Sequence, residues 1–430
     1  MKKKRRIRRQ ADPQLGWLYL SRAALDSARE QLDTHEQGVR DELGFGAIHF
    51  GYADRFFPGT SVLLTRLRYA VFIPWLYQDL QRNFRGEVFP KDELAEQERD
   101  LANALKNNYL DRGLDRRGII GRFVVADRPP VVLPSQIYWP SLVSWKIVAA
   151  MEDGSRPPRS EVQADWERFA RPSAERLASD DGQDVQPSQL LFDLPRLDQG
   201  KKEWSQRREG SGKISFRLTK EERDVLRDKL KVLPRPKEAG DGLSLFAKLA
   251  DNVEEVNVDA KSAWSPAIRK FADDSDKDAL RRAEQAALLV QFGRGIYDAL
   301  VARSRAKDDK DFKCDAEASL ATLLEDESAV KKACGLELAG LKHDGVKIDG
   351  KLAGFLREIQ EWCRKPGDVE DLREHFRLRE WDQRPGRARL AEGAIERRGN
   401  WNPPKDLPRA LSYRWEVVTS LLADLKGERE

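Results

Sequence analysis

The chain has 430 residues, of which 40% are hydrophobic and 35% are charged, so it can build the core of a globular protein of two or three domains. Its net charge of +4 is set by residues 2–9, which contain seven cations and no acid. The other 70 basic residues face 73 acidic ones, which excludes a body that attracts nucleic acid as a whole. Any affinity for DNA must therefore come from the N-terminal residues or from local patches.

Residues 1–10 are predicted to form a disordered basic arm. The cations that would contact phosphate groups non-specifically are Lys2, Lys3, Lys4, Arg5 and Arg6. A tail that only aids solubility is the alternative. No apolar stretch follows the arm, which argues against a secretory signal, and the three cysteines form no CxxC pair. We therefore expect a cytoplasmic protein.

A helix is predicted at Ser21–Leu32, where apolar residues recur on one face. The segment Val62–Leu80 is apolar nearly all round, as expected of an element buried in a large domain. Its two arginines and Pro74 argue against a membrane span, and Pro74 predicts a kink or a division of the element.

The arginines of this segment, Arg66 and Arg68, are candidates for a structural role. A buried arginine must be paired with an acid or must hold an anionic ligand. We predict that Arg66 or Arg68 pairs with a carboxylate, of which Asp54 and Asp79 are the nearest in sequence. Trp75, in the same apolar segment, is expected in the core.

A basic loop follows a second amphipathic helix predicted at Glu93–Tyr109. The loop spans residues 112–122, and its cations are Arg112, Arg116, Arg117 and Arg122. Its glycines would let backbone amides approach a phosphate while the arginines bind it. A solvated turn is the alternative. The GK[ST] ending of a nucleotide-binding loop is missing, so ATP binding is not expected.

The middle of the chain is predicted to be less regular. Residues 123–133 indicate an extended segment, and Ser135 is expected to cap the helix that follows. Residues 151–212 are rich in Pro, Ser and Asp and predict a linker with short ordered pieces. Residues 214–218 alternate like a short strand, and Thr219 with Glu222 then forms a capping box for a helix.

Beyond this point the pattern is helical. Apolar residues recur at helical spacing in 280–300, 352–362, 369–376 and 411–425, and Gly293 and Gly295 would permit close helix approach. The sequence thus predicts a mainly α fold with minor β. Two helical lobes, 11–150 and 213–430, are expected on either side of the linker.

The richest local patch is 384–414, where eight basic residues face three acids and aromatic rings interleave with the cations. Candidate nucleic-acid contacts are Arg387, Arg389, Arg397 and Arg398. This mixture suits a single strand, whose bases stack on rings and whose phosphates meet cations, and it equally suits a domain seam. Trp401, beside an Asn-Pro-Pro turn, is the candidate for partner binding.

Two other groups of residues are weaker candidates for a functional site. His49 and Asp54 invite comparison with a metal-dependent nuclease, although no further carboxylate is fixed beside them, and a structural hydrogen-bond network is the alternative. The scattered soft ligands lack the paired spacing of a zinc site, so no metal is expected; they are Cys314, Cys334, His343, Cys363 and His375. We assign no catalytic residue and no cofactor.

Four separated patterns carry a family resemblance. They are GWLYLS at 16–21, FPGTS with TRLRY and PW at 57–75, PSxIYW at 134–139 and LSYRW at 411–415. Together they resemble an uncharacterised family of bacterial proteins, often encoded beside helicases and phospholipase-D-like proteins in phage-defence or DNA-modification islands. The resemblance implies a non-catalytic nucleic-acid-binding or scaffold subunit of such a complex, with a helicase or phospholipase-D-like nuclease as possible partner. A divergent metal-dependent nuclease is the alternative.

Overall fold

The computed structural model describes residues 41–84, 86, 88–122, 132–170, 191–195, 197–206 and 214–430. Within these ranges the protein is mainly helical and contains no sheet, which confirms the predicted fold class. The helices of the first half are α2 (Gly46–Phe56), α3 (Tyr69–Asn83), α4 (Lys91–Asp111), α5 (Pro134–Ser144), α6 (Arg159–Ala164), α7 (Trp166–Ala170) and α9 (Asp198–Gln206). Those of the second half are α10 (Lys220–Leu230), α11 (Leu245–Asp251), α12 (Pro266–Arg269), α13 (Asp274–Asp308), α14 (Ala316–Glu325), α15 (Glu327–Cys334), α16 (Leu338–His343), α17 (Gly350–Arg364), α18 (Arg373–Gln383), α19 (Ile395–Gly399) and α20 (Trp415–Lys426).

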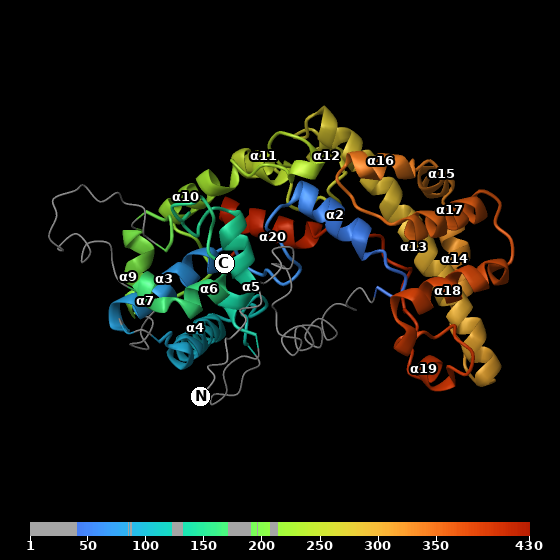
Figure 1. Cartoon of the computed structure of the whole chain (residues 1–430), viewed down its shortest axis with the longest axis horizontal. Helices are drawn as coiled ribbons and strands as arrows, with labels where there is room; N and C mark the ends of the chain where they lie inside the picture. Colours follow the sequence, from blue (N-terminus) through green and yellow to red (C-terminus); the bar gives the residue numbers. More distant parts are fainter. Residues whose placement is uncertain are drawn as a thin grey trace, which may run out of the picture.

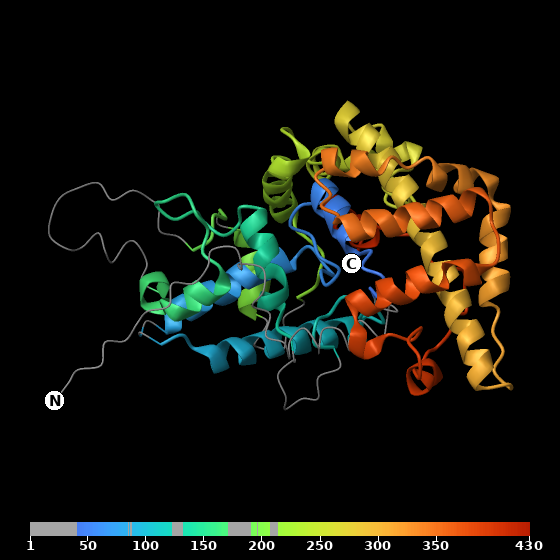
Figure 2. The ribbon, with the colours of Figure 1, turned by 45° about the vertical axis from the view of Figure 1, so that its right-hand side comes forward.

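The helices form an elongated, arched body (Figure 1). One end carries α3 to α7 and α9, and the other carries α13 to α19, as a second view also shows (Figure 2). Between them lie α2, α11 and the last helix, α20, which contacts both α10 and α11. The final helix of the chain therefore packs in the middle of the molecule.

The long helix α13 organises the second half. At 35 residues it is about 50 Å long, and it contacts α14, α15, α17 and α19. Asp273 begins it by accepting a hydrogen bond from the amide of Asp276. A Cβ at Gly293 would lie 2.9 Å from the Phe45 ring and 3.0 Å from Ile359, so the predicted close approach is confirmed there.

The apolar segment predicted at 62–80 is mostly buried from Leu64 onward, whereas Val62 is exposed, and the segment is only partly helical. Helix α3 begins at Tyr69, and residues before it form turns that place Arg66 and Arg68 inward. Pro74 lies inside α3, between buried residues on both sides. The apolar pattern predicted burial correctly but could not locate the start of the helix.

Three details of the predicted elements differ in the structure. The segment 214–218 forms no strand; its carbonyl and amide groups bond to side chains instead, as when Phe216 N donates to Tyr109 Oη at 3.0 Å. Ser135 is not the cap of α5, which already begins at Pro134 with Leu133 as its N-cap residue. The Thr219–Glu222 capping box is confirmed at the start of α10, at 2.8 and 3.2 Å.

One hydrophobic cluster extends from Leu43 to Leu425. It includes parts of the predicted linker, because Val162, Trp166 and Trp204 are all buried in it. The division of the chain into two lobes stays a prediction, and the arm at 1–10 and the helix at Ser21–Leu32 lie outside the described residues. None of the helices in the described ranges combines the length and the apolar character needed to cross a membrane.

Candidate nucleic-acid interface

Arg66 is buried and paired, as predicted, but with a distant acid. Its Nε atom donates to both carboxylate oxygens of Asp424 on α20, at 3.0 and 3.1 Å, and its Nη1 atom donates to the carbonyl of Glu430 at 2.7 Å. The guanidinium also lies 4.6 Å from the centre of the Phe216 ring. Asp424 receives the Leu67 amide at 2.7 Å as well. Burial raises the pKa of Asp424, and the charge of Arg66 opposes that rise.

Arg68 is buried beside a second acid. Its Nη2 atom lies 3.0 Å from Glu222 and 3.1 Å from Glu203, and Nη1 donates to the carbonyl of Ser215 at 2.8 Å. Glu222 is the same residue that closes the capping box of α10, so one carboxylate serves a local and a long-range contact. Both arginines thus have protein partners, which supports a structural role rather than an exposed ligand site.

The two acids nearest to Arg66 and Arg68 in sequence, Asp54 and Asp79, contact other residues, so the predicted partners were wrong. Asp54 lies 2.7 Å from Arg414, and Asp79 accepts the indole N–H of Trp204 at 2.9 Å. Trp75 is buried, with its ring 5.5 Å from that of Trp204, as expected of a core residue.

The basic loop at 112–122 packs on Thr65 and Arg66 of the TRLRY pattern. Thr65 donates to the carbonyl of Gly118 at 2.7 Å, and a Cβ at Gly118 would lie 2.9 Å from the Arg66 side chain. Gly118 has φ +96°, so both its backbone and its surroundings favour glycine. These contacts show that the loop packs on Thr65 and on the buried Arg66 and so has a structural role.

The four arginines of that loop differ in their surroundings. Arg112 pairs with Glu430 and Arg117 pairs with Asp115 at the surface. Arg116 is exposed and has no ion pair among the described residues, and Arg122 is half-buried. Surface pairs of this kind are worth about 0–1 kcal/mol, so a phosphate could replace the acid. Phosphate contact by the loop stays a prediction.

Three cations of the 384–414 stretch are structural. Arg398 binds Asp308 through two nitrogens and donates to the carbonyl of Arg389 at 2.8 Å. Arg389 lies 3.0 Å from Glu42, and Arg414 lies 2.7 Å from Asp54. All three join segments that are distant in sequence, which supports a structural role, and nucleic-acid contact by Arg389 and Arg398 stays a prediction.

The other five cations have no ion pair with any residue in the described ranges; they are Arg384, Arg387, Arg397, Lys405 and Arg409. Three of them, Arg384, Arg387 and Arg397, lie close in sequence to exposed apolar side chains. We call this group the α18–α19 surface and define it by Leu378, Trp381, Arg384, Arg387, Ile395 and Arg397. Trp381 is 47% exposed, and Leu378 and Ile395 are 50% and 60% exposed. Arg397 donates to the carbonyl of Gly386 at 3.5 Å, which joins α19 to the short turn after α18.

Trp401 is 5% exposed, so its side chain offers little area to a partner. Its ring lies 6.3 Å from that of Phe312, and its carbonyl accepts a hydrogen bond from Arg305 at 2.5 Å. The Asn-Pro-Pro turn beside it suggested an exposed position, whereas the turn instead folds Trp401 into the core. Partner binding by Trp401 stays a prediction without a structural argument in its favour.

His49 and Asp54 both lie on α2 but in different surroundings. His49 is buried, and burial followed by the charges of Arg414 and Arg294 lowers its pKa to about 4. It is therefore neutral near pH 7. Across the described residues no group of three or more His, Cys, Asp or Glu side chains is arranged to hold a metal ion.

Sequence reasoning missed a buried polar group around Glu98. Its Oε1 atom accepts the Ser135 amide at 2.7 Å, and burial raises the pKa of Glu98 to about 7. The Ser135 hydroxyl, the Tyr77 hydroxyl and Arg159 belong to the same buried group, in which the charge of Arg159 opposes the rise in pKa of Glu98 and of Tyr77. A signal was available: Glu98 lies four residues after Leu94, on the apolar face of α4.

The arm residues Lys2, Lys3, Lys4, Arg5 and Arg6 lie outside the described residues. A search of curated proteins and a search of solved structures find no match to this chain. Residues 14–156 match the model of a family of unknown function, DUF6361. This range includes the first three of the four sequence patterns and excludes the LSYRW tail, and the chain is therefore similar over about a third of its length to a family without an assigned activity.

Proposed function

We propose that this chain is a non-catalytic subunit that binds nucleic acid, or serves as a scaffold, in a bacterial anti-phage defence or DNA-processing complex of the cytoplasm. The observation that carries the proposal is the α18–α19 surface, where the exposed Trp381 is followed within six residues by Arg384 and Arg387, neither of which forms an ion pair with a described residue. The resemblance to proteins encoded beside helicases and phospholipase-D-like nucleases supplies the setting and the class of partner.

The chemistry of the α18–α19 surface suits a single strand. Bases stack on an exposed indole without regard to their identity, and guanidinium groups bind the phosphates between them. The acids of α18 are engaged: Glu374 binds Arg377 at 2.6 Å and Asp382 binds Lys351 at 2.7 Å. Glu392 and Glu396 remain exposed near α19 and limit the net charge of the surface. We therefore expect modest, salt-sensitive binding.

Fluorescence anisotropy with a labelled single-stranded oligonucleotide tests this proposal. Trp381→Ala should weaken binding about 5-fold or more, because one stacked base is worth about 1–3 kcal/mol. Replacing Arg384 and Arg387 together by Ala should reduce the log–log salt slope by about 1.4, if each contacts one phosphate of a single strand.

The matched control replaces Lys237 and Lys261 by Ala. Both side chains are exposed and neither forms an ion pair with a described residue, so the change in charge is the same as in the arginine pair. The proposal fails if the two double variants have the same salt slope, or if Trp381→Ala binds like the parent.

We propose that the basic arm at residues 1–10 adds non-specific affinity for nucleic acid. A chain that begins at Ala11 should lose about 4 to 6 units of salt slope on duplex DNA if most of the seven cations engage phosphates. An unchanged slope would leave the arm as a solubilising tail.

A further inference from the structure

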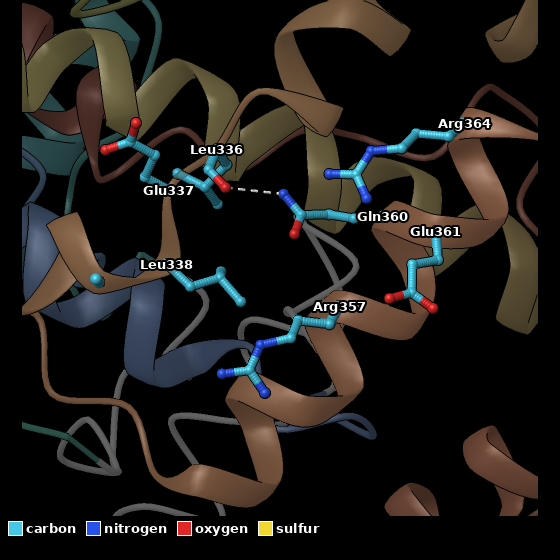
Figure 3. Close-up of a pocket in the computed structure, with 8 residues that line it drawn as sticks. Leu336, Glu337, Leu338, Arg357, Gln360, Glu361 and Arg364 are labelled. Atoms are coloured by element: carbon cyan, nitrogen blue, oxygen red, sulfur yellow. Dashed lines mark hydrogen bonds between the residues drawn. The ribbon is translucent and has the colours of Figure 1, made fainter.

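A pocket of about 470 Å³ opens beside α17. Its lining comes from α17, from the first turn of α16 and from the connection between α15 and α16, and includes Glu337, Leu338, Arg357, Gln360, Glu361 and Arg364 (Figure 3). Small-molecule sites typically measure about 300–1,000 Å³, so the pocket is large enough for an organic ligand, and a lone inorganic ion would leave much of it empty.

Gln360 gives the pocket a fixed acceptor. Its side chain is 4% exposed, and its amide nitrogen donates to the carbonyls of Ala333 at 3.2 Å and Leu336 at 2.9 Å. Because both N–H groups are used, the orientation of the amide is determined. Its oxygen points into the pocket (Figure 3). A ligand must therefore present a donor at this position.

Two arginines supply positive charge at the pocket. Arg357 and Arg364 are exposed, and neither pairs with an acid in the described part of the chain. Arg364 donates one bond, to the carbonyl of Cys334 at 3.1 Å, which directs its guanidinium toward Gln360. Seven residues separate the two arginines, or roughly 10 Å along the helix axis. The Glu337 carboxylate points away from the pocket, whereas Glu361 lies between the two arginines in sequence (Figure 3).

We propose that this pocket binds a nucleoside phosphate. Arg357 or Arg364 would bind the phosphate, since a guanidinium offers paired donors to its oxygens. The carboxylate of Glu361 suits ribose hydroxyls, and the amide oxygen of Gln360 suits an N–H group of the base. The half-buried side chain of Leu338 provides apolar contact for the flat base. The proposal does not depend on nucleic-acid binding by the α18–α19 surface.

A nucleoside phosphate can be a free nucleotide or the phosphorylated end of a nucleic-acid strand. Titration calorimetry of the full chain would use nucleoside 5′-monophosphates, inorganic phosphate and a 5′-phosphorylated dinucleotide. We expect at least one monophosphate to bind more tightly than inorganic phosphate. A dinucleotide that binds about tenfold tighter than the monophosphate would identify the strand end as the source, and equal or weaker binding would identify the free nucleotide.

The variants Arg357→Ala and Arg364→Ala test the residues. At least one should weaken binding about tenfold or more, as expected for a lost charge-assisted hydrogen bond. Lys365→Ala is the matched control, because Lys365 is an exposed cation next to Arg364 that does not line the pocket. All three changes are at exposed positions, and thermal unfolding will confirm that each variant folds. The proposal is overturned if no monophosphate binds, if inorganic phosphate binds equally well, or if both arginine variants bind like Lys365→Ala.

Discussion

The Arg66–Asp424 pair permits a direct test of how the two ends of the described chain stabilise each other. Arg66→Met removes a charge that is 2% exposed and leaves Asp424 buried with only the Leu67 amide and the distant charge of Arg429 as compensation. Removing one member of a buried pair costs about 3–5 kcal/mol. Asp424→Leu should cost at least as much, because it also leaves the Leu67 amide without its acceptor, at about 1–3 kcal/mol.

The double variant shows whether Arg66 and Asp424 stabilise the fold as an ion pair or contribute independently to the free energy of unfolding. With both charges replaced by apolar side chains, no unpaired charge remains buried, so most of the cost of each single change should disappear. We expect the double variant to be at least about 3 kcal/mol more stable than the sum of the single effects would give.

Urea denaturation followed by tryptophan fluorescence and by circular dichroism measures these free energies of unfolding. Arg82→Met is the control, because Arg82 lies 3.5 Å from Asp79 with its side chain 58% exposed, and a surface pair is worth about 0–1 kcal/mol. Equal stability of Arg66→Met and Arg82→Met, or strict additivity in the double variant, would refute the reasoning.

Three further changes test other features. Glu98→Gln should flatten the pH dependence of stability. The folded pKa of Glu98 is about 7 and the usual value is 4.5, so the free energy of unfolding of the parent falls by about 3 kcal/mol as pH rises from about 4.5 to 7. Denaturation of parent and variant at pH 5 and pH 8 measures the difference. His49→Asn should remove a pH dependence of the opposite sign. The folded pKa of His49 is about 4 and the usual value is 6.5, so the free energy of unfolding of the parent rises by about 3 kcal/mol between pH 4 and pH 6.5. If the variant loses stability at acid pH as steeply as the parent, this reasoning is contradicted. Gly59→Ala should destabilise by about 1–3 kcal/mol, because Gly59 has φ +75° and a Cβ would lie 2.6 Å from Ser144. In Gly113→Ala, at φ +64° with open space, only the backbone strain applies, so a thermal shift equal to that of Gly59→Ala would count against the steric part.

Local rules predicted the elements that local forces determine. The amphipathic pattern at Glu93–Tyr109 corresponds to α4, and the Thr219–Glu222 box starts α10 where expected. The pattern also indicated that Arg66 and Arg68 would be buried and paired. It could not name their partners, because Asp424 lies 358 residues after Arg66 and Glu222 lies 154 residues after Arg68.

The candidate interface could be predicted only in part for the same reason. A count of cations cannot tell Arg398, which is bound to Asp308, from Arg387, which is exposed. Trp401 appeared suited to an interface because of the turn beside it, while Trp381, on α18, is the exposed tryptophan among those that the structure describes. Which face of a short helix is covered depends on the tertiary neighbours, and these are not encoded in its own few residues.

The distance along the chain between Arg66 and Asp424 has a consequence for synthesis. At about 5–20 residues per second, the ribosome adds Asp424 roughly 20 to 70 s after Arg66. During that time the arginine cannot occupy its buried position with its charge matched, and the same holds for Arg68 until Glu222 appears. The matched region 14–156 contains both arginines and neither acid, so it is not expected to fold as an independent fragment. The apolar segment around these arginines therefore stays without its ionic partners until the residues of α20 are made, and during that time it is prone to aggregation.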